Sequence, residues 1–441
     1  MTPQPGRVRD LLPRALPAAV LIAALALPAA VSATTHDTDF EGLILGQFEI
    51  YDPEYRVHHE HYGKRLAELA AALANAQARG LNLHCSQQMF LEAKWLHRYT
   101  AHWGRLEDKL QRIEQSLDET DQSFAAEQRP VDGYWGPCYE ELFMRLSATI
   151  DGIADLNAIG EQPRYRIRAT GRLNTGKELL RYLQDMLVSD IANTGIDHRG
   201  ELSSLITTYA QGAFKPGFKE LLEGSVDLRS SSTLDALKEA FRFFLSGAQD
   251  PETGYWGAWY LVQGKVYKSA DLSMTYHVVA YTRGRVERWP KIIETTMHIE
   301  AHPYPYGWRH HGRYNNHNLY DVARIYRFGW PHMTEVQREA VSRQLEAMLE
   351  WSLENTLGPD GTFIVDPTFS DSLADEYYFG VSFLDAAGYW RPEERFWKGG
   401  RIDADAAARC CHLKRRLEAL DLEGWAAEGA MRKLRRNCGS C

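Results

Sequence analysis

The sequence predicts an all-α protein, built as an (α/α) barrel or toroid of about six repeated helical hairpins. Apolar residues recur at three-to-four spacing through most of the chain, which is typical of amphipathic helices. No run of alternating polar and apolar residues is long enough to indicate more than a short strand. A nine-residue loop sequence also returns between helical patterns, and repeated hairpins bury their apolar faces against neighbouring repeats.

The expected helices follow one another with Pro and Gly residues at the joints. In order, they cover residues 65–77, 87–117, 139–156, 177–189, 202–210, 233–246, 272–283, 290–299, 317–328, 334–355, 372–387 and 404–420. Because no Ser/Gly-rich linker interrupts this series, residues 34–441 are expected to form a single domain with a Cys-rich C-terminal tail.

Residues 1–33 have the features of a signal peptide. Arg7, Arg9 and Arg14 precede an apolar stretch at residues 16–31, which is too short for a comfortable membrane span. Small residues at 31–33 then provide a cleavage site. We expect export to the periplasm or the medium, without stable membrane insertion after cleavage; a retained N-terminal anchor is the alternative.

Composition narrows the possible functions. The chain has 441 residues, of which 44% are hydrophobic and 25% charged, and this excludes a mostly disordered protein. The net charge of -9 makes nucleic acid an unfavourable partner. Aromatic residues make up 11% of the chain, which points weakly to carbohydrate as a ligand because sugar rings stack on aromatic faces.

The six cysteines are an even number, as expected in an oxidising compartment. Four of them crowd the C-terminus at positions 410, 411, 438 and 441. Disulfides that fasten the tail are the favoured interpretation, and a zinc site that includes His412 is the alternative. The pairing is not determined by the sequence, and no metal or cofactor is expected.

The repeated loop begins at Gln128 and again at Gln249, and six of its nine positions are identical. A fainter copy covers residues 358–363. The second copy, with the preceding Phe244 and Leu245, resembles the QW motif of triterpene cyclases, in which Gln and Trp tie helix ends together in a double α-toroid. The resemblance implies architecture only. Gln is expected to bond free helix-terminal amides, and Trp256 is alternatively a platform for a sugar ring.

A polar and aromatic block at residues 302–321 is the main candidate site. It concentrates His, Tyr, Arg and Asn in a loop that leads into a helix, where toroids form their clefts. The candidate binding residues in this block are Trp308, His310, His311 and Tyr314.

Within this block, Asn315-Asn316-His317 resembles the Asn-Asn-His signature of alginate lyases and related polysaccharide lyases on (α/α) toroids. The family places a catalytic Tyr fifty to sixty residues later, and Tyr377 follows His317 by 60 residues. The resemblance covers about residues 300–390. The family's Arg shortly before the Tyr is absent, and Arg313 or Arg309 would have to replace it.

This resemblance implies β-elimination at a uronate. Asn316 and Arg313 would neutralise the carboxylate and stabilise an enolate-like intermediate. His317 or a tyrosine would remove the proton at C5, and Tyr377 or Tyr378 would protonate the leaving oxygen.

A second candidate cluster is Tyr276 and His277, early in a helix that follows the clearest loop copy. By the repeat, this pair is expected at the same level of the ring as residues 376–378. Tyr276 would bind substrate, and His277 would be a further acid or base.

Two other function classes remain open. A glycoside hydrolase on the same scaffold needs two carboxyl groups, and Asp271 and Glu376 are the pair to test because their helices are related by the repeat. A non-catalytic polysaccharide-binding protein of an export system would keep the aromatic residues without the acid and base geometry.

Overall fold

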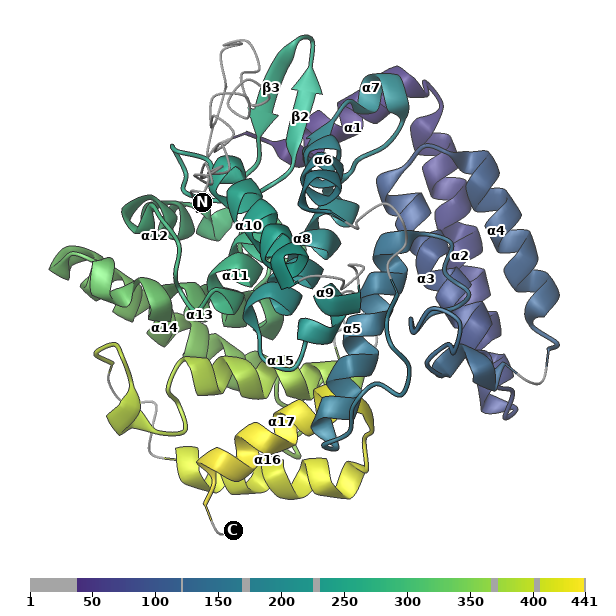
Figure 1. The fold of residues 1–441 in the computed structure, drawn as a ribbon. Helices are drawn as coiled ribbons and strands as arrows, with labels where there is room; N and C mark the ends of the chain where they lie inside the picture. Colours follow the sequence, from purple (N-terminus) through teal and green to yellow (C-terminus); the bar gives the residue numbers. More distant parts are fainter. Residues whose placement is uncertain are drawn as a thin grey trace, which may run out of the picture.

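The computed structural model describes residues 38–119, 122–168, 175–224, 231–365, 372–399 and 405–439. These residues are mostly helical, as predicted (Figure 1). The predicted signal peptide and Cys441 lie outside them. In the described part of the chain, no helix is both long and apolar enough to cross a membrane.

The helices vary from one turn to more than six turns. Their bounds are α1 Phe40–Tyr51, α2 Tyr55–Ala78, α3 His84–Tyr99, α4 Trp103–Ser116, α5 Leu142–Ala158, α6 Gly176–Leu187, α7 Ile191–Thr194, α8 Arg199–Phe214, α9 Lys219–Gly224, α10 Ser231–Ala248, α11 Leu272–Tyr281, α12 Trp289–His298, α13 Asn316–Gly329, α14 Glu335–Asn355, α15 Leu373–Ala386, α16 Ala406–Leu420 and α17 Gly424–Asn437. The strands are β1 Val188–Ser189, β2 Trp259–Val262 and β3 Lys265–Lys268.

Six helices form a closed series of contacts. Helix α5 packs on α8, α8 on α11, α11 on α13, α13 on α15 and α15 on α17, and α17 returns to α5. Further helices pack against this series, with α6 against α8, α12 and α14 against α13, and α16 against α17. The apolar faces of both sets meet in one large core.

Helices α2, α3 and α4 form a separate unit at one flank of the molecule (Figure 1). They bury their own apolar cluster, which includes Leu69, Leu96, Leu106, Leu110 and Ile113. Helix α4 shows why they associate, because its apolar residues recur every three or four positions and lie on one face.

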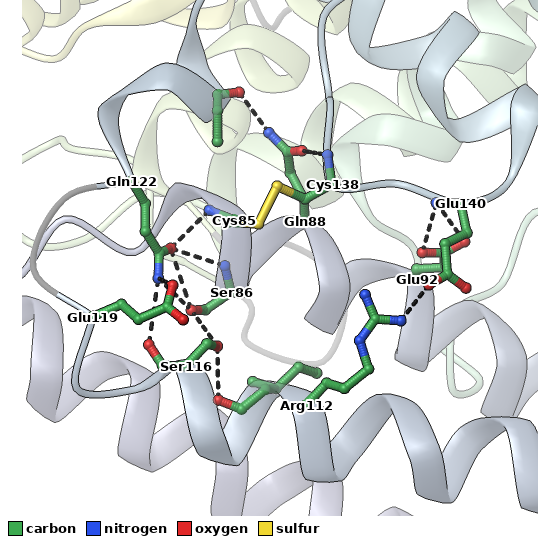
Figure 2. The surroundings of a disulfide bond; sticks show 12 residues. Cys85, Ser86, Gln88, Glu92, Arg112, Ser116, Glu119, Gln122, Cys138 and Glu140 are labelled. Atoms are coloured by element: carbon green, nitrogen blue, oxygen red, sulfur yellow. Dashed lines mark hydrogen bonds and ion pairs between the residues drawn. A yellow bond between two sulfur atoms is a disulfide. The ribbon is translucent and has the colours of Figure 1, made fainter.

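A disulfide joins this unit to the start of α5 (Figure 2). Cys85, in the first turn of α3, is bonded to Cys138 in the loop before α5. Around it, Gln122 Oε1 accepts hydrogen bonds from the backbone N–H groups of Cys85 and Ser86, at 2.9 and 3.1 Å. These amides open α3 and have no partner within the helix, so Gln122 acts as its cap.

A buried ion pair reinforces the same junction. Lys109 Nζ of α4 lies 2.9 Å from Glu92 Oε2 of α3, and both side chains are buried. The Glu92 carboxylate also accepts hydrogen bonds from the backbone N–H groups of Glu140 and Glu141, just before α5. Charge on Glu92 is therefore compensated on several sides, as a buried carboxylate requires.

The repeated loop folds as the same turn in its first two copies. Gln128 Nε2 donates to the carbonyls of Gly133 and Tyr165. Gln249 Nε2 donates in the same way to Gly254 and Glu287. In both, the glycine has a positive φ, 74° and 71°, which glycine adopts without strain. The structural role expected for Gln is present, but Gln binds loop carbonyls instead of the helix-terminal amides that we expected.

The turn also fixes the helix that follows it. The backbone N–H of Trp135 donates to Thr149 Oγ1 of α5, and that of Trp256 donates to Thr275 Oγ1 of α11, both at 3.1 Å. Thr149 and Thr275 therefore occupy corresponding positions in α5 and α11. Each helix is bonded to its preceding turn through the same contact.

Some elements differ from the sequence-based expectation. The helix expected over residues 87–117 is two helices, because the chain turns at Thr100, which bridges to Ile196. Helices α1 and α17 and the hairpin β2–β3 were not predicted. At the C-terminus Cys410 is disulfide-bonded to Cys438, and His412 Nε2 contacts the Asp360 carbonyl, so Cys410, Cys438 and His412 do not assemble the alternative zinc site.

Candidate functional site

The six helices of the closed series surround a cavity of about 880 Å³, which we call the central cavity. Each of the six contributes lining side chains. Those that carry chemistry are Asp151 of α5, Gln211 of α8 with Lys215 just after it, Tyr276, His277 and Tyr281 of α11, His317 and Tyr320 of α13, Tyr378 of α15, and Arg432, Lys433 and Arg436 of α17.

His317 is held in one orientation at the start of α13. Asn318 Nδ2 donates to the Trp308 carbonyl at 2.9 Å, which turns Asn318 Oδ1 toward the imidazole. His317 Nδ1 lies 3.2 Å from that oxygen and is therefore its donor. The lone pair is left on Nε2. Burial lowers the pKa of His317 to about 4, so the ring is neutral at physiological pH and Nε2 is its basic nitrogen.

His277 is the second imidazole of the central cavity. Its Nδ1 lies 3.2 Å from the Tyr281 hydroxyl, one helical turn further along α11. Burial, with a smaller effect of nearby His317, lowers the pKa of His277 to about 3. Both rings are therefore neutral bases across the physiological range, and they are close enough that a charge on one disfavours a charge on the other.

Three tyrosines face the same space as proton donors. Burial raises the pKa of Tyr276, Tyr281 and Tyr378 above the usual range, so all three hydroxyls keep their protons at neutral pH. Tyr378 packs against α17, where a Cβ on Gly429 would lie 2.8 Å from its ring. Only glycine at that position allows the two helices to approach this closely.

Cationic side chains from α8 and α17 make one side of the central cavity positive. Lys433 Nζ lies 4.2 Å from the centre of the Tyr378 ring, a cation–π contact. Burial, with Arg432 nearby, lowers the pKa of Lys433 to about 8, and burial also lowers the pKa of Lys215. Among the described residues that line the cavity, Asp151 alone is acidic. The local charge is therefore positive in a chain that is negative overall.

The structure brings together Tyr276, His277, His317 and Tyr378 from the predicted set. It places the other predicted catalytic residues elsewhere. Asn316 is buried and binds Thr356 and Ser352 at the end of α14. Tyr377 is fully buried with its ring edge-on to Phe363, at 5.2 Å between centres. Arg313 is exposed in a loop, where it bridges to His310.

Most of the predicted binding residues also lie away from the central cavity. Trp256 and Trp308 are buried, and the Trp256 indole donates to the Leu245 carbonyl. Tyr314 stacks beneath Arg309, whose guanidinium carbon lies 3.6 Å from the ring centre. His310 and His311 line a different cavity beside Tyr304.

The two carboxyl groups expected for a hydrolase are both buried and neither lines the central cavity. Asp271 caps α11 by accepting a hydrogen bond from Met274 N–H, and it pairs with Arg199 at 2.7 Å. Glu376 is buried in the first turn of α15. Asp321, another buried carboxyl, is raised in pKa by its burial and by Asp271, and so is held uncharged.

No family model, curated protein or solved structure matches this chain.

Sequence reasoning missed Asp151, Lys215, Tyr281, Arg432 and Lys433. Lys433 and Arg432 lie on α17, whose two glycines weaken the helical pattern. The spacing of Trp425, Gly429 and Arg432 along α17 is a one-face signal that was available in the sequence. Among the described residues, no three or more His, Cys, Asp or Glu side chains lie together so as to hold a metal ion.

Proposed function

We propose that this protein is an exported enzyme that cleaves a uronate-containing polysaccharide by β-elimination in the central cavity. The observation that supports it is the meeting of neutral imidazoles, protonated tyrosines and a cationic wall in one space. Elimination needs these three elements, namely a base for the C5 proton, an acid for the leaving oxygen and positive charge for the uronate carboxylate.

The scaffold that we propose is an (α/α)6 toroid, with α5, α8, α11, α13, α15 and α17 as its inner ring. The closed series of contacts and the repeated turn support it. Such a ring explains why six helices distant in sequence line one cavity, since each presents one face to the axis.

The roles within the site follow from protonation. His317 Nε2 takes the proton from C5, while Lys215, Arg432 and Lys433 bind the carboxylate and stabilise the charge that develops on it. The C4–O bond breaks, a C4–C5 double bond forms, and the Tyr378 hydroxyl gives its proton to the departing oxygen. His277 and Tyr281, at hydrogen-bond distance from each other, then carry the proton from His317 back to the Tyr378 phenolate, which returns both groups to their starting state.

A glycoside hydrolase finds less support, because a hydrolase requires two carboxyl groups beside the substrate. The central cavity offers Asp151, whereas Asp271 and Glu376 lie outside its lining. A non-catalytic binding protein would need no such set of bases and acids.

The test follows two signals from the purified chain on uronate polymers and neutral glucans, namely the ultraviolet absorbance of an unsaturated uronate and the release of reducing ends. We expect both signals together on a uronate polymer. Tyr378→Phe should lower kcat by about 10²–10⁴-fold. The matched control is Tyr377→Phe, which alters a buried hydroxyl that packs toward Phe363 and not into the central cavity, and it should leave kcat within about twofold. Reducing ends without absorbance would refute elimination, and equal effects of the two variants would refute the assignment of Tyr378.

A further inference from the structure

A second concave site lies beside Tyr304, near the N-terminal end of α8. Lys215, which lines the central cavity, lies just after the other end of α8. The second site consists of two adjoining cavities of about 610 and 410 Å³, which share Glu41, Arg98 and Tyr304, and we call it the Tyr304 groove. Arg199, the first residue of α8, lines the groove, whereas Gln211 and Lys215 at the other end of α8 line the central cavity. A helix of 16 residues is about 24 Å long, so Arg199 in the groove and Lys215 in the central cavity lie far apart.

The floor of the groove is a rigid polar network. The Arg199 guanidinium is fixed from two sides, with Nε 2.7 Å from Asp271 Oδ2 and Nη1 donating to the Tyr99 hydroxyl at 3.0 Å. Asp197 accepts a hydrogen bond from the Arg199 backbone N–H at 2.9 Å. Asp197 and Arg199 are 4% and 8% exposed, so these charges are held in place rather than freely solvated. Fixed polar groups at the base of a concave site are what orient a small ligand.

The walls of the groove are aromatic and the rim is cationic. The aromatic residues that line it are Phe48, Tyr55, Tyr99, Tyr304 and Tyr306. Arg98 is exposed and belongs to both adjoining cavities, while His310 and His311 line the smaller one. The groove also contains Glu41, Glu60 and Asp197, so its charge is too balanced for a polyphosphate and its floor too polar for a lipid tail.

One layer of side chains separates the groove from the central cavity. The Tyr304 ring, which lines both parts of the groove, meets the His317 ring edge-on at 5.8 Å between centres. His317 in turn lines the central cavity, and nearby His310 on the groove side contributes, after burial, to lowering the pKa of His317. The loop at residues 302–311 therefore contributes to the groove, and the start of α13 contributes to the central cavity.

We propose that the Tyr304 groove is a second binding site for an acidic oligosaccharide, in which tyrosine faces hold the sugar rings and Arg98 meets an acidic group. The choice of an acidic saccharide rests on the proposed function, but the groove is a separate site. The protein then binds two oligosaccharides, one at each end of α8.

The test is a calorimetric titration with a uronate tetrasaccharide, carried out in the Tyr378→Phe background so that the probe is not consumed. We expect two sites per chain. Arg98→Ala should weaken one of them about tenfold or more by removing a charge-assisted hydrogen bond. Lys433→Gln should weaken the other. Arg79→Ala, an exposed arginine at the end of α2 that lines neither space, is the matched control and should leave both sites unchanged.

The outcomes separate the two proposals. A single site that is lost in Lys433→Gln and untouched in Arg98→Ala would overturn the groove and leave the proposed function standing. A site that survives in Lys433→Gln and is lost in Arg98→Ala, in a chain that cleaves no uronate polymer, would support the groove and overturn the lyase. A chain that binds no saccharide would overturn both.

Discussion

At the scale of single residues, the site depends on which of two neighbouring side chains faces the cavity. His317 and Tyr378 line the central cavity, whereas Asn316 and Tyr377 point into the packing against α14 and Phe363. Adjacent residues on an α-helix are about 100° apart, so a motif can place a helix near the site without fixing its rotation. This is why the sequence predicted every lining helix except α17 but assigned fewer of the residues that face the cavity.

The positive wall gives the site a pH dependence. Lys433 has a pKa of about 8 because burial disfavours its charge, so it is charged at pH 7 and loses its proton as the pH rises to 9. We expect KM for an acidic substrate to rise about tenfold over this range through loss of one charge-assisted contact. Lys433→Arg should keep its affinity at pH 9, since arginine stays protonated. Identical pH profiles for the two proteins would contradict the assignment.

Asp151 should make stability fall as the pH rises. Burial first, and then Asp155 and Asp375, raise the pKa of Asp151 to about 7. Between pH 4 and 7 the folded chain therefore keeps a proton that the unfolded chain releases, and the free energy of unfolding decreases through this window.

Asp151→Asn should remove this dependence. The side chain is exposed to the cavity, so solvent screens part of the effect, and we expect a gain of roughly 1 kcal/mol at pH 8 with no gain at pH 4. Urea unfolding at the two pH values measures the difference. A gain of equal size at both would show that the carboxyl charge is not its cause.

At the scale of elements, the two disulfides connect different parts of the fold, and one of these parts lines the central cavity. Cys85–Cys138 joins the α2–α4 unit to the start of α5, and Cys410–Cys438 joins α16 to the end of α17. Helix α17 carries Lys433 and Arg432, whereas α2, α3 and α4 contribute no lining to the central cavity.

Replacing Cys85 and Cys138 by Ala should lower the free energy of unfolding by about 2–4 kcal/mol and leave kcat/KM unchanged below the melting temperature. Replacing Cys410 and Cys438 by Ala should instead raise KM, because α17 is loosened. Thermal unfolding and steady-state kinetics on both double variants make the comparison. A loss of kcat/KM in the first variant at low temperature would show that the flanking unit supports the site directly.

Helix prediction failed where tertiary contacts decide the outcome. Helices α3 and α4 are separate because Thr100 and Ala101 bond to the segment around Gly195, which is distant in sequence. No Pro or Gly lies between the two helices, and the nearest glycine, Gly104, is inside α4. Helix α17 forms despite its glycines because Gly429 permits close packing on Tyr378. Local propensity is a weak guide where packing offsets it.

At the scale of the whole molecule, charge is distributed unevenly. The chain has a net charge of -9, and the central cavity gathers Lys215, Arg432, Lys433 and Arg436. Affinity for a charged oligosaccharide should therefore fall as salt rises from 0.05 to 0.5 M, because mobile ions screen the attraction. A neutral oligosaccharide of equal length is the control and should show little change. Equal salt dependence for both would mean that the cationic wall does not select the ligand.

The helical class and the repeat could be predicted from the sequence, because both are patterns that recur at regular spacing along the chain. The sequence does not predict that Lys215 and Lys433, which are more than two hundred residues apart, lie in one cavity. Their grouping depends on the contact of α17 with α5. The His-rich loop shows the same limit. Its composition predicts one site, but the structure divides it between the central cavity and the Tyr304 groove.

The recurring turn relates the residues with which three helices, α5, α11 and α15, line the central cavity. A Cβ on Gly152 would lie 2.5 Å from Trp135, and one on Gly380 would lie 2.2 Å from Phe363, so the first and third turns seat an aromatic ring on corresponding glycines. With Thr149 matched to Thr275, three residue pairs become equivalent and all of them line the central cavity, namely Ile150-Asp151, Tyr276-His277 and Tyr378-Phe379. Helices α5, α11 and α15 thus present equivalent positions to the central cavity, and the reactive groups at these positions differ in the two side chains of each pair. Exchanging pairs between these helices is expected to move the acid and the base to another side of the same cavity.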